Sequence, residues 1–571
     1  MPETSTDQIA PKTPEVSPPP RTPGDGTLLL TLMGVHTLLR LALLNVNQGE
    51  YTDGILQLTQ FERTDSFWPP LYTALVWLPR LCGLEALTAG RLVSVAASVA
   101  LLPALWRTAR TWAGRRSALF AGILYTVSPV VMRWSIRVMT DMTFVCLFQW
   151  ACAAVLLLWS RGNTQNPSES ALSPSSPAVK RNGQEPLRQR PGLTLTGLTL
   201  LSVLATLTRY QGLLLAPVVA VTFVALWLGR LPAARGQRHR PWGALAAQLT
   251  WLALPAWLLF QRFGHIQQVA NRVPPGDLWT VVTTYWGRFE MFLYLTPYIL
   301  TLPVFVFFMA GLLTKPASAQ TKEATSPLPL RRFFLYCSVC VLVAQTAFLS
   351  FQERYLLPLL PFAFICAGAG MARSEEALTQ WGKRGHTVFQ ALVLLTVCWS
   401  FGFGLLAIAL QRGAFADLYD AGHYLRSLTD LPPDTRIYTT ESYGPNPGME
   451  GIHLAFVSGR KALPLLGKTG DLAQMAPGSL VVIDSRSIQG WDPSAPPTDP
   501  AQGFGRYQNF IQYLKTRYNL KLLRDAEFTH STIPLLPDIM GAGGEQSETA
   551  WLARYQQQMF KTCIFVVEAK P

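Results

Sequence analysis

Apolar residues gather into about eleven runs of roughly twenty residues each, separated by polar and charged loops. The runs lie at 27–46, 88–106, 117–134, 141–159, 193–208, 212–229, 242–261, 291–313, 333–350, 355–372 and 387–411. A helix needs ~20 consecutive apolar residues to cross the hydrocarbon core of a bilayer. The pattern therefore predicts a polytopic α-helical membrane protein with about eleven spans.

The loops between these runs carry an uneven distribution of charge. Basic residues concentrate in the loops at 107–116, 160–192 and 230–241, in the loop of Lys315, Lys322, Arg331 and Arg332, and in the loop of Arg373, Lys383 and Arg384. All five loops fall on one side of the membrane if the N-terminus is cytoplasmic. Since cytoplasmic loops carry the excess of Lys and Arg, we predict a multi-pass protein of the cytoplasmic (inner) cell membrane whose C-terminal part lies outside.

One more apolar segment, FWPPLYTALVWLPRLCGL at 67–84, interrupts this alternation. A crossing at this point would move every later Arg-rich loop to the outer side. Arg80 and the three prolines of the segment suit the membrane interface better than the hydrocarbon core. We therefore expect an amphipathic helix that lies on the outer surface.

The two ends of the chain differ from the spans. Residues 1–26 are rich in Pro, Ser, Thr and charge, which predicts a disordered cytoplasmic tail. Residues 27–411 form the transmembrane part, with a first outer loop at 47–87. In residues 412–571, DTRIYTT and GSLVVIDSR have the pattern of short buried strands, and 504–518 that of an amphipathic helix. We expect a small extracytoplasmic α/β domain there.

Composition supports a membrane protein and argues against nucleic-acid binding. Only 14% of the 571 residues are charged, against about 25% in ordinary soluble domains. Residues 1–411 contain 33 basic and 18 acidic residues, whereas residues 412–571 contain 15 and 16. Because the basic excess lies in short loops between apolar runs, it reflects topology rather than affinity for DNA or RNA.

Cysteine and histidine give little indication of a metal site. Six of the eight cysteines lie inside apolar runs, where cysteine behaves as a small hydrophobic residue. Cys337 and Cys340 have CxxC spacing without further ligands nearby, and His265 is isolated. We assign no metal ligands and no cofactor, and leave a divalent-cation requirement open.

Acidic residues of the first 411 positions indicate where chemistry takes place. Nine of them fall on the outer side in this topology: Glu50, Asp53, Glu62, Asp65, Glu85, Asp141, Asp277, Glu290 and Glu353. Transporters usually place ionisable groups near the bilayer midplane. The spans here are nearly free of them, and the main exception, Arg40, is close enough to the outer end of its span to reach the interface. These charges predict a site at the outer membrane surface.

A series of segments resembles the multi-span glycosyltransferases of the GT-C fold. In chain order they are EYTDGILQLTQFE, FWPPLYTAL, AGRLVSVAAS, ALFAGILYTVSPVVMRWSIRVMTDMTF, LTRYQGLLLAP and QERYLLPLLPF. The chain is most similar to the bacterial dolichyl-phosphate-mannose-protein mannosyltransferase and aminoarabinose transferase type, over about residues 27–411. The resemblance implies transfer of a hexosyl or pentosyl group, with inversion, from a polyprenyl-phosphate carrier at the outer face.

The resemblance also assigns roles to particular residues. Asp53 occupies the position of the family's catalytic acid in the first outer loop, and Asp141 that of its second recurrent acid. Most members have another acid directly after the first, where this chain has Gly54. Arg209 in TRYQG and Arg354 in QERY match arginines at outer helix ends, and we add Tyr355 and Arg137 as donor phosphate-binding candidates. Arg133 and Arg272 are weaker candidates.

The chemistry suits these residue types. An acceptor hydroxyl loses a proton as it attacks the anomeric carbon, so one carboxylate can act as general base. A lipid phosphate leaves as a stable anion and needs positive charge, which arginine supplies through a planar fork.

Simpler interpretations remain open for each residue. Asp53 can be merely solvated, and Asp141 can cap its helix or pair with Arg137. Arg354 and Tyr355 can be interfacial anchors.

We therefore expect a GT-C glycosyltransferase that moves a sugar from a polyprenyl-phosphate donor to a lipid, glycan or protein acceptor. An envelope-glycan polymerase or ligase is the alternative within the enzyme class. A transporter or flippase of lipid-linked sugars is the alternative outside it. For the C-terminal domain, acceptor recognition and a plain structural cap are both open.

Overall fold

The computed structural model describes most of the chain outside its long loops. The described residues are 24–62, 68–160, 191–228, 299–313, 353–432, 434–441, 451–466, 472–485, 500–530 and 558–569, with a few single positions between 253 and 296. The predicted N-terminal tail lies outside them up to residue 23, while its last two residues already belong to a helix; the predicted span 333–350 also lies outside them. The predicted span 242–261 is represented only by single helical positions.

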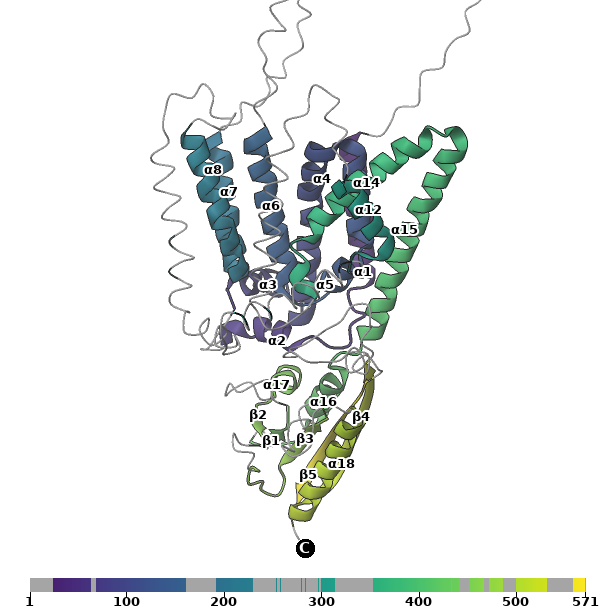
Figure 1. The fold of residues 1–571 in the computed structure, drawn as a ribbon. Helices are drawn as coiled ribbons and strands as arrows, with labels where there is room; N and C mark the ends of the chain where they lie inside the picture. Colours follow the sequence, from purple (N-terminus) through teal and green to yellow (C-terminus); the bar gives the residue numbers. More distant parts are fainter. Residues whose placement is uncertain are drawn as a thin grey trace, which may run out of the picture.

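Long helices of residues 25–411 run alongside one another (Figure 1). They are α1 (Asp25–Ala42), α4 (Ala86–Val127), α6 (Thr140–Ser160), α7 (Pro191–Thr208), α8 (Leu215–Trp227), α12 (Leu302–Leu313), α14 (Leu360–Thr379) and α15 (Gly382–Gln411). Among the described helices, α4 and α15 are long and apolar enough to cross a membrane, and α6, α7, α8 and α12 contain shorter apolar stretches. The number of about eleven spans remains a prediction.

Helix α4 contains two of the predicted apolar runs. We expected a loop at 107–116, but the helix continues on both sides of a single break at Gly114, where φ is 89° and ψ is −180°. The Tyr125 hydroxyl donates to the carbonyl oxygen of Ser98 at 2.9 Å, although a straight helix would place these residues about 40 Å apart. The break therefore reverses the chain, and glycine permits this because it has no Cβ.

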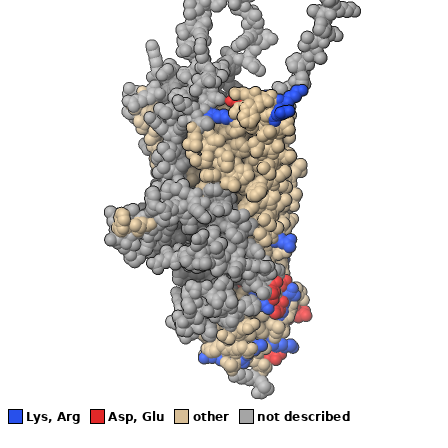
Figure 2. All heavy atoms as spheres, turned by 45° about the vertical axis from the view of Figure 1, so that its right-hand side comes forward, with Lys and Arg blue, Asp and Glu red and all other residues tan. Residues whose placement is uncertain are grey.

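Charged side chains join three segments at one end of the bundle. Asp25 at the start of α1 pairs with Arg110 and, at 2.7 Å, with Arg115 beside the break in α4. Arg116 pairs with Glu375 of α14 at 2.8 Å. Basic side chains gather at this end, and a largely uncharged surface separates them from the mixed charges at the opposite end (Figure 2). The start of α1, the turn of α4 and the end of α14 thus lie on the same side.

Arg40 is placed differently from our expectation. Its side chain is fully buried, and Nη2 donates to the carbonyl oxygen of Thr126 in α4 at 2.9 Å. Nearby on α1, Nε2 of His36 lies 3.0 Å from the hydroxyl of Ser98. Arg40 therefore turns into the bundle instead of reaching the interface, because a backbone carbonyl of α4 offers it an acceptor there.

Short helices lie at the end of the bundle opposite Asp25. They are α2 (Thr52–Leu58), η1 (Gln60–Glu62), α3 (Leu71–Leu81), α5 (Pro129–Trp134), η2 (Tyr210–Leu214) and η5 (Glu353–Leu356). With 11 residues, α3 extends only ~16 Å and is too short to cross a bilayer. It buries Tyr72 and Val76 and exposes Trp77 and Leu81. The amphipathic helix predicted within 67–84 is present, and its place on the outer surface remains a prediction.

After α15 the chain forms a five-stranded sheet at this same end (Figure 1). Its strands are β1 (Ile437–Thr439), β2 (Ala462–Pro464), β3 (Leu480–Asp484), β4 (Asn519–His530) and β5 (Gln558–Glu568), in the order β2-β1-β3-β5-β4. The first three are parallel, and β3, β5 and β4 are antiparallel neighbours. Both predicted strand segments contain strands, β1 and β3.

Helices cover the two faces of this sheet because successive residues of a strand point to opposite sides. From β3, Val481 and Ile483 share a cluster with Phe510 of α18 (Pro500–Arg517). Leu480 and Val482 share another with Leu418 of α16 (Ala416–Ser427). Helix α18 confirms the amphipathic helix predicted at 504–518. The remaining described helix of this part, α17 (Ile452–Ser458), lies next to α16 and on the side of α2 (Figure 1).

The topology can be tested by labelling single cysteines with a membrane-impermeant maleimide. The native Cys563 is a poor reporter, since burial raises the pKa of its thiol to about 11 and thiolate is the reactive form. Lys521→Cys on exposed β4 and Lys383→Cys at the start of α15 replace exposed lysines at opposite ends. In intact cells carrying Cys82→Ser, we expect label on Lys521→Cys alone. Label on Lys383→Cys alone, or equally on both, would contradict the orientation.

Candidate active site

Two ion pairs bring together four of the predicted site residues at the end of the bundle that faces the sheet. Asp53 lies in the first turn of α2 and pairs with Arg354 of η5. Asp141 lies in the first turn of α6 and pairs with Arg209, the residue before η2. The partners are separated by 301 and 68 residues. The fold thus joins each predicted acid to one predicted arginine.

The Asp53–Arg354 pair is the more accessible of the two. Nη2 of Arg354 donates to Oδ2 of Asp53 at 2.6 Å. The Arg354 side chain is 5% exposed, whereas that of Asp53 is 32% exposed. Arg354 also lies beside Trp134, with 5.5 Å from Cζ to the ring centroid, and Nη1 is 3.4 Å from Sδ of Met139. The protein therefore holds the arginine in place and leaves part of the carboxylate open.

The Asp141–Arg209 pair is closed to solvent. Nη1 of Arg209 donates to Oδ1 of Asp141, and the two side chains are 8% and 3% exposed. Nε of Arg209 donates to Oε1 of Gln211 at 3.1 Å. Of the two partners considered for Asp141, the helix end and Arg137, neither provides the ion pair. Asp141 fixes the start of α6 against the end of α7 instead.

A third buried carboxylate, Glu50, holds the base of the first outer loop. It is fully buried, and Nε of Arg91 donates to its Oε1 at 2.6 Å. The backbone N–H of Val138 donates to Oε2 at 3.3 Å, and Arg137 Nη1 lies 3.8 Å from that oxygen. Arg91 further donates to the carbonyl oxygens of Leu44 and Asn47. Glu50 thus ties the loop to α4 and to the segment between α5 and α6.

Arg137 is part of this frame. Its Nη1 donates to the carbonyl oxygen of Gly49 at 2.6 Å, and its Nη2 to that of Gln411 at 3.1 Å. Its side chain is fully buried, and Cζ lies 4.9 Å from the ring centroid of Tyr51. The guanidinium fork is therefore occupied by backbone carbonyls of the first loop and of the end of α15.

Aromatic rings separate the arginines of the site. Arg133 Nη2 donates to the Tyr51 hydroxyl at 2.7 Å, and its Cζ lies 4.7 Å from the ring centroid of Trp134. Tyr51 and Trp134 are 5.6 Å apart between centroids. Since a cation is attracted to the face of an aromatic ring, Tyr51 and Trp134 allow Arg133, Arg137 and Arg354 to lie close together.

Several predicted positions are described incompletely or not at all. Tyr355 lies in η5 next to Arg354, but its side chain is outside the described part. His265, Arg272, Cys337 and Cys340 fall in segments that the structure does not describe. Within the described residues, no three His, Cys, Asp or Glu side chains come together as a metal site.

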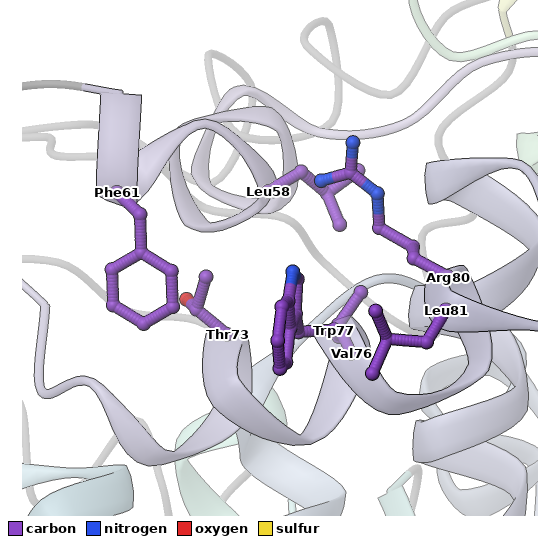
Figure 3. A pocket seen from close by; sticks show the side chains of 7 residues that line it. All are labelled: Leu58, Phe61, Thr73, Val76, Trp77, Arg80 and Leu81. Atoms are coloured by element: carbon purple, nitrogen blue, oxygen red, sulfur yellow. The ribbon is translucent and has the colours of Figure 1, made fainter.

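A small pocket lies within the first outer loop, between the segment of α2 and η1 and the helix α3 (Figure 3). It has a volume of about 360 Å³ and is lined by Leu58, Phe61, Thr73, Val76, Trp77, Arg80 and Leu81. The Thr73 hydroxyl fixes α3 to the loop by donating to the carbonyl oxygen of Gln57 at 2.8 Å. The first outer loop thus carries two features. The Asp53–Arg354 ion pair lies at the start of α2, and the mostly apolar pocket, with Arg80 as its charged residue, lies between the end of α2 and α3.

Sequence reasoning found the paired acids and arginines but not their supporting residues. Glu50 was only one of nine outer acids, and Arg91 and Tyr51 carried no signal. The departure at Gly54 is now explained, because a Cβ at this position would lie 2.5 Å from the carbonyl oxygen of Val138. Helix α2 approaches the segment before α6 so closely that a second acid cannot follow Asp53 in this arrangement.

We predict that Gly54→Ala impairs the site although it adds a single methyl group. The backbone of α2 has to move away from Val138, which shifts Asp53 relative to Arg354. Gly197→Ala on α7 is the matched control, since nothing lies within 4 Å of its added Cβ. Activity of the purified proteins should fall at least ~10-fold for Gly54→Ala and stay near the parent value for Gly197→Ala. Equal activity for both variants would show that this close approach is unimportant.

Comparison with known proteins gives both a family match and a fold match. Residues 68–166 match the dolichyl-phosphate-mannose-protein mannosyltransferase family. A comparison with curated protein sequences gives no match. Among solved structures, ArnT from Cupriavidus metallidurans in the apo state superimposes with a TM-score of 0.53 at 12% identity, covering 87% of this chain and 96% of that chain. The same ArnT has also been solved bound to undecaprenyl phosphate.

Two further similarities are weaker. The archaeal oligosaccharyltransferase AglB from Archaeoglobus fulgidus gives a TM-score of 0.47 at 14% identity, covering 82% of this chain and 71% of that chain. The mycobacterial arabinofuranosyltransferase AftD gives 0.48 at 14% identity, covering 95% of this chain and 42% of that chain. The similarity to ArnT carries the conclusion, and the family match over residues 68–166 agrees with it: this chain has the GT-C fold.

Proposed function

We propose that this protein transfers a sugar from a polyprenyl-phosphate carrier to an acceptor at the outer face of the membrane. The GT-C fold supports a glycosyltransferase. The observation that carries the proposal is the Asp53–Arg354 pair, because it places a partly open carboxylate beside a held guanidinium at the end of the bundle. Such a pair offers one group for the acceptor's proton and one for the donor's phosphate.

In this proposal, the arginines bind the leaving group. Breaking the bond between the anomeric carbon and the phosphate oxygen returns an electron pair to the phosphate, which leaves as an anion. Arginine can bind that anion through two parallel N–H···O hydrogen bonds. Arg354 is the first candidate, since its pair with Asp53 is the accessible one. Arg209 and Tyr355 remain candidates of the same group, and Arg137 acts by positioning the loop.

Asp53 is the proposed general base. As the acceptor oxygen forms its bond to the anomeric carbon, the acceptor proton passes to the Asp53 carboxylate. Attack on the face opposite to the phosphate inverts the configuration at the anomeric carbon. Asp141 and Glu50 are less suited to this role because both carboxylates are buried and already bound by arginines. We assign Asp141 to positioning.

The sugar and the acceptor define the finer part of the proposal. A mannose carrier is the first to test, given the name of the matching family. Aminoarabinose and arabinofuranose carriers test the pentosyl group that the resemblance of the sequence also implies. An envelope-glycan polymerase or ligase would use the same chemistry with a glycan acceptor. A flippase would need no general base, so the Asp53 variant separates it from the enzymes.

Asp53→Asn should abolish most of the transfer while donor binding survives. The amide keeps the shape of the side chain but cannot accept the acceptor's proton, and general-base catalysis contributes ~10²–10⁴-fold. Transfer from the three labelled carriers to envelope acceptors should fall by about that factor in reconstituted vesicles.

Glu85→Gln is the matched control, because Glu85 is an exposed carboxylate before α4 on the same side. Glu50→Gln is unsuitable, since breaking a buried ion pair destabilises a protein by about 3–5 kcal/mol. Full activity of Asp53→Asn would remove the base role.

Arg354→Lys should weaken donor binding because it keeps the charge but loses the planar fork. Arg354→Ala should weaken it further, by about 10- to 100-fold, since hydrogen bonds to charged groups contribute ~1.5–3 kcal/mol. Binding of a labelled carrier to the folded, purified protein measures this effect. Arg426→Ala on exposed α16 is the control for a change in net charge. Unchanged affinity in Arg354→Ala would place the phosphate elsewhere.

A further inference from the structure

A buried histidine joins the C-terminal part of the chain to the first outer loop. His453, on α17, is fully buried, and its imidazole stacks on Phe415 with 4.6 Å between ring centroids. Nδ1 lies 2.8 Å from Oε1 of Glu441, the second residue after β1. Nε2 lies 3.1 Å from the carbonyl oxygen of Glu50. His453 thus joins the segment after β1 to a loop residue that lies 403 positions before it in the chain.

The acceptor on the loop determines which nitrogen of this ring donates to it. The carbonyl oxygen of Glu50 can only accept, so Nε2 donates to it. Oxygens of Glu441 accept from the backbone N–H groups of His453 and Leu454, at 2.9 Å and 3.3 Å, and Oε1 forms a hydrogen bond with Nδ1. Glu441 thus holds the ring in the orientation in which Nε2 meets the loop.

The contact at Glu50 is one of several that fix this loop from the C-terminal side. The backbone N–H of Gln48 donates to the carbonyl oxygen of Arg412 at 2.9 Å. At Gly49, a Cβ would lie 2.5 Å from the carbonyl oxygen of Ala414. An apolar cluster of Ile55, Tyr419, Ile452 and Val457 continues the interface along α2. The backbone on both sides of Asp53 therefore rests on the C-terminal part.

We propose that His453 is a positioning residue for the reaction: its imidazole clamps the Glu50 carbonyl and so holds Asp53, three residues further on, at the angle at which it meets the acceptor. This inference rests on the function proposed for Asp53. It gives the C-terminal part a direct effect on turnover, separate from acceptor recognition and from a plain structural cap. Reacting groups lose about 100-fold in rate when they are misplaced by ~1 Å.

Replacing His453 with glutamine or with asparagine tests the hydrogen bonds of its two nitrogens separately. In His453→Gln, the amide nitrogen can reach the position of Nε2 and still donate to Glu50. In His453→Asn, the amide can reach the position of Nδ1 beside Glu441 but stops short of the loop. His423→Asn is the matched control, because His423 is exposed on α16.

Hydrogen exchange of residues 48–56 and steady-state transfer from the labelled carriers are measured for each variant. We expect His453→Asn to raise exchange in this peptide and to lower kcat at least ~10-fold, with KM for the carrier unchanged. His453→Gln should stay within about 3-fold of the parent. A merely structural role would instead lower thermal stability in both variants without a split between kcat and KM.

Hydrogen exchange decides the inference even if none of the three carriers is a substrate. Parent-like exchange in His453→Asn would overturn the clamp, whatever the activity. If the parent transfers no sugar but His453→Asn raises exchange at 48–56, the clamp holds and the proposed function fails. If His453→Asn does not fold, His453→Phe takes its place, since it keeps a ring stacked on Phe415 and removes both nitrogens. Normal exchange in a folded His453→Phe protein would then overturn the proposal.

Discussion

Charge buried at the end of this helical bundle that faces the sheet has to be neutralised locally, because the apolar helices leave little water to solvate it. The fold meets this constraint with three carboxylates and their arginines. Glu50 with Arg91, and Asp141 with Arg209, are buried pairs that fix the first outer loop and the start of α6. The remaining pair, Asp53 with Arg354, keeps one partner partly exposed. Of these three carboxylates, that of Asp53 is the one left accessible.

The two halves of the chain share responsibility for the loop that carries Asp53. From the membrane side, Arg91 and Arg137 hold Glu50 and the backbone carbonyls around it. From the C-terminal side, the Glu441–His453 pair reaches the carbonyl of the same residue. Both networks meet at Glu50, three residues before Asp53. The loop is therefore held from two directions, which suits a site where small displacements have large effects on rate.

Much of the fold could be predicted because its signals are local. Apolar runs located the described long helices, and the prolines with Arg80 distinguished the short helix α3 from the spans. The supporting network could not be predicted, because its partners are far apart in the sequence. Arg91 follows Glu50 by 41 residues, and His453 follows it by 403. Gly54 could be predicted in part. Comparison with the family pattern showed that the usual second acid is replaced by glycine, but the reason, the close approach of Val138, is visible only in the structure. Arg40 was placed wrongly because its acceptor, the Thr126 carbonyl, lies on another helix.

The central claim is that Arg354 receives the carrier phosphate while Asp53 stays available to the acceptor. A cryo-EM structure of the protein in lipid nanodiscs with a polyprenyl phosphate tests this claim most directly. The account predicts phosphate density within hydrogen-bond distance of the Arg354 guanidinium, with the Asp53 carboxylate directed at the space where the anomeric carbon would lie. Phosphate bound away from both residues, with the Asp53–Arg354 pair unchanged, would contradict it.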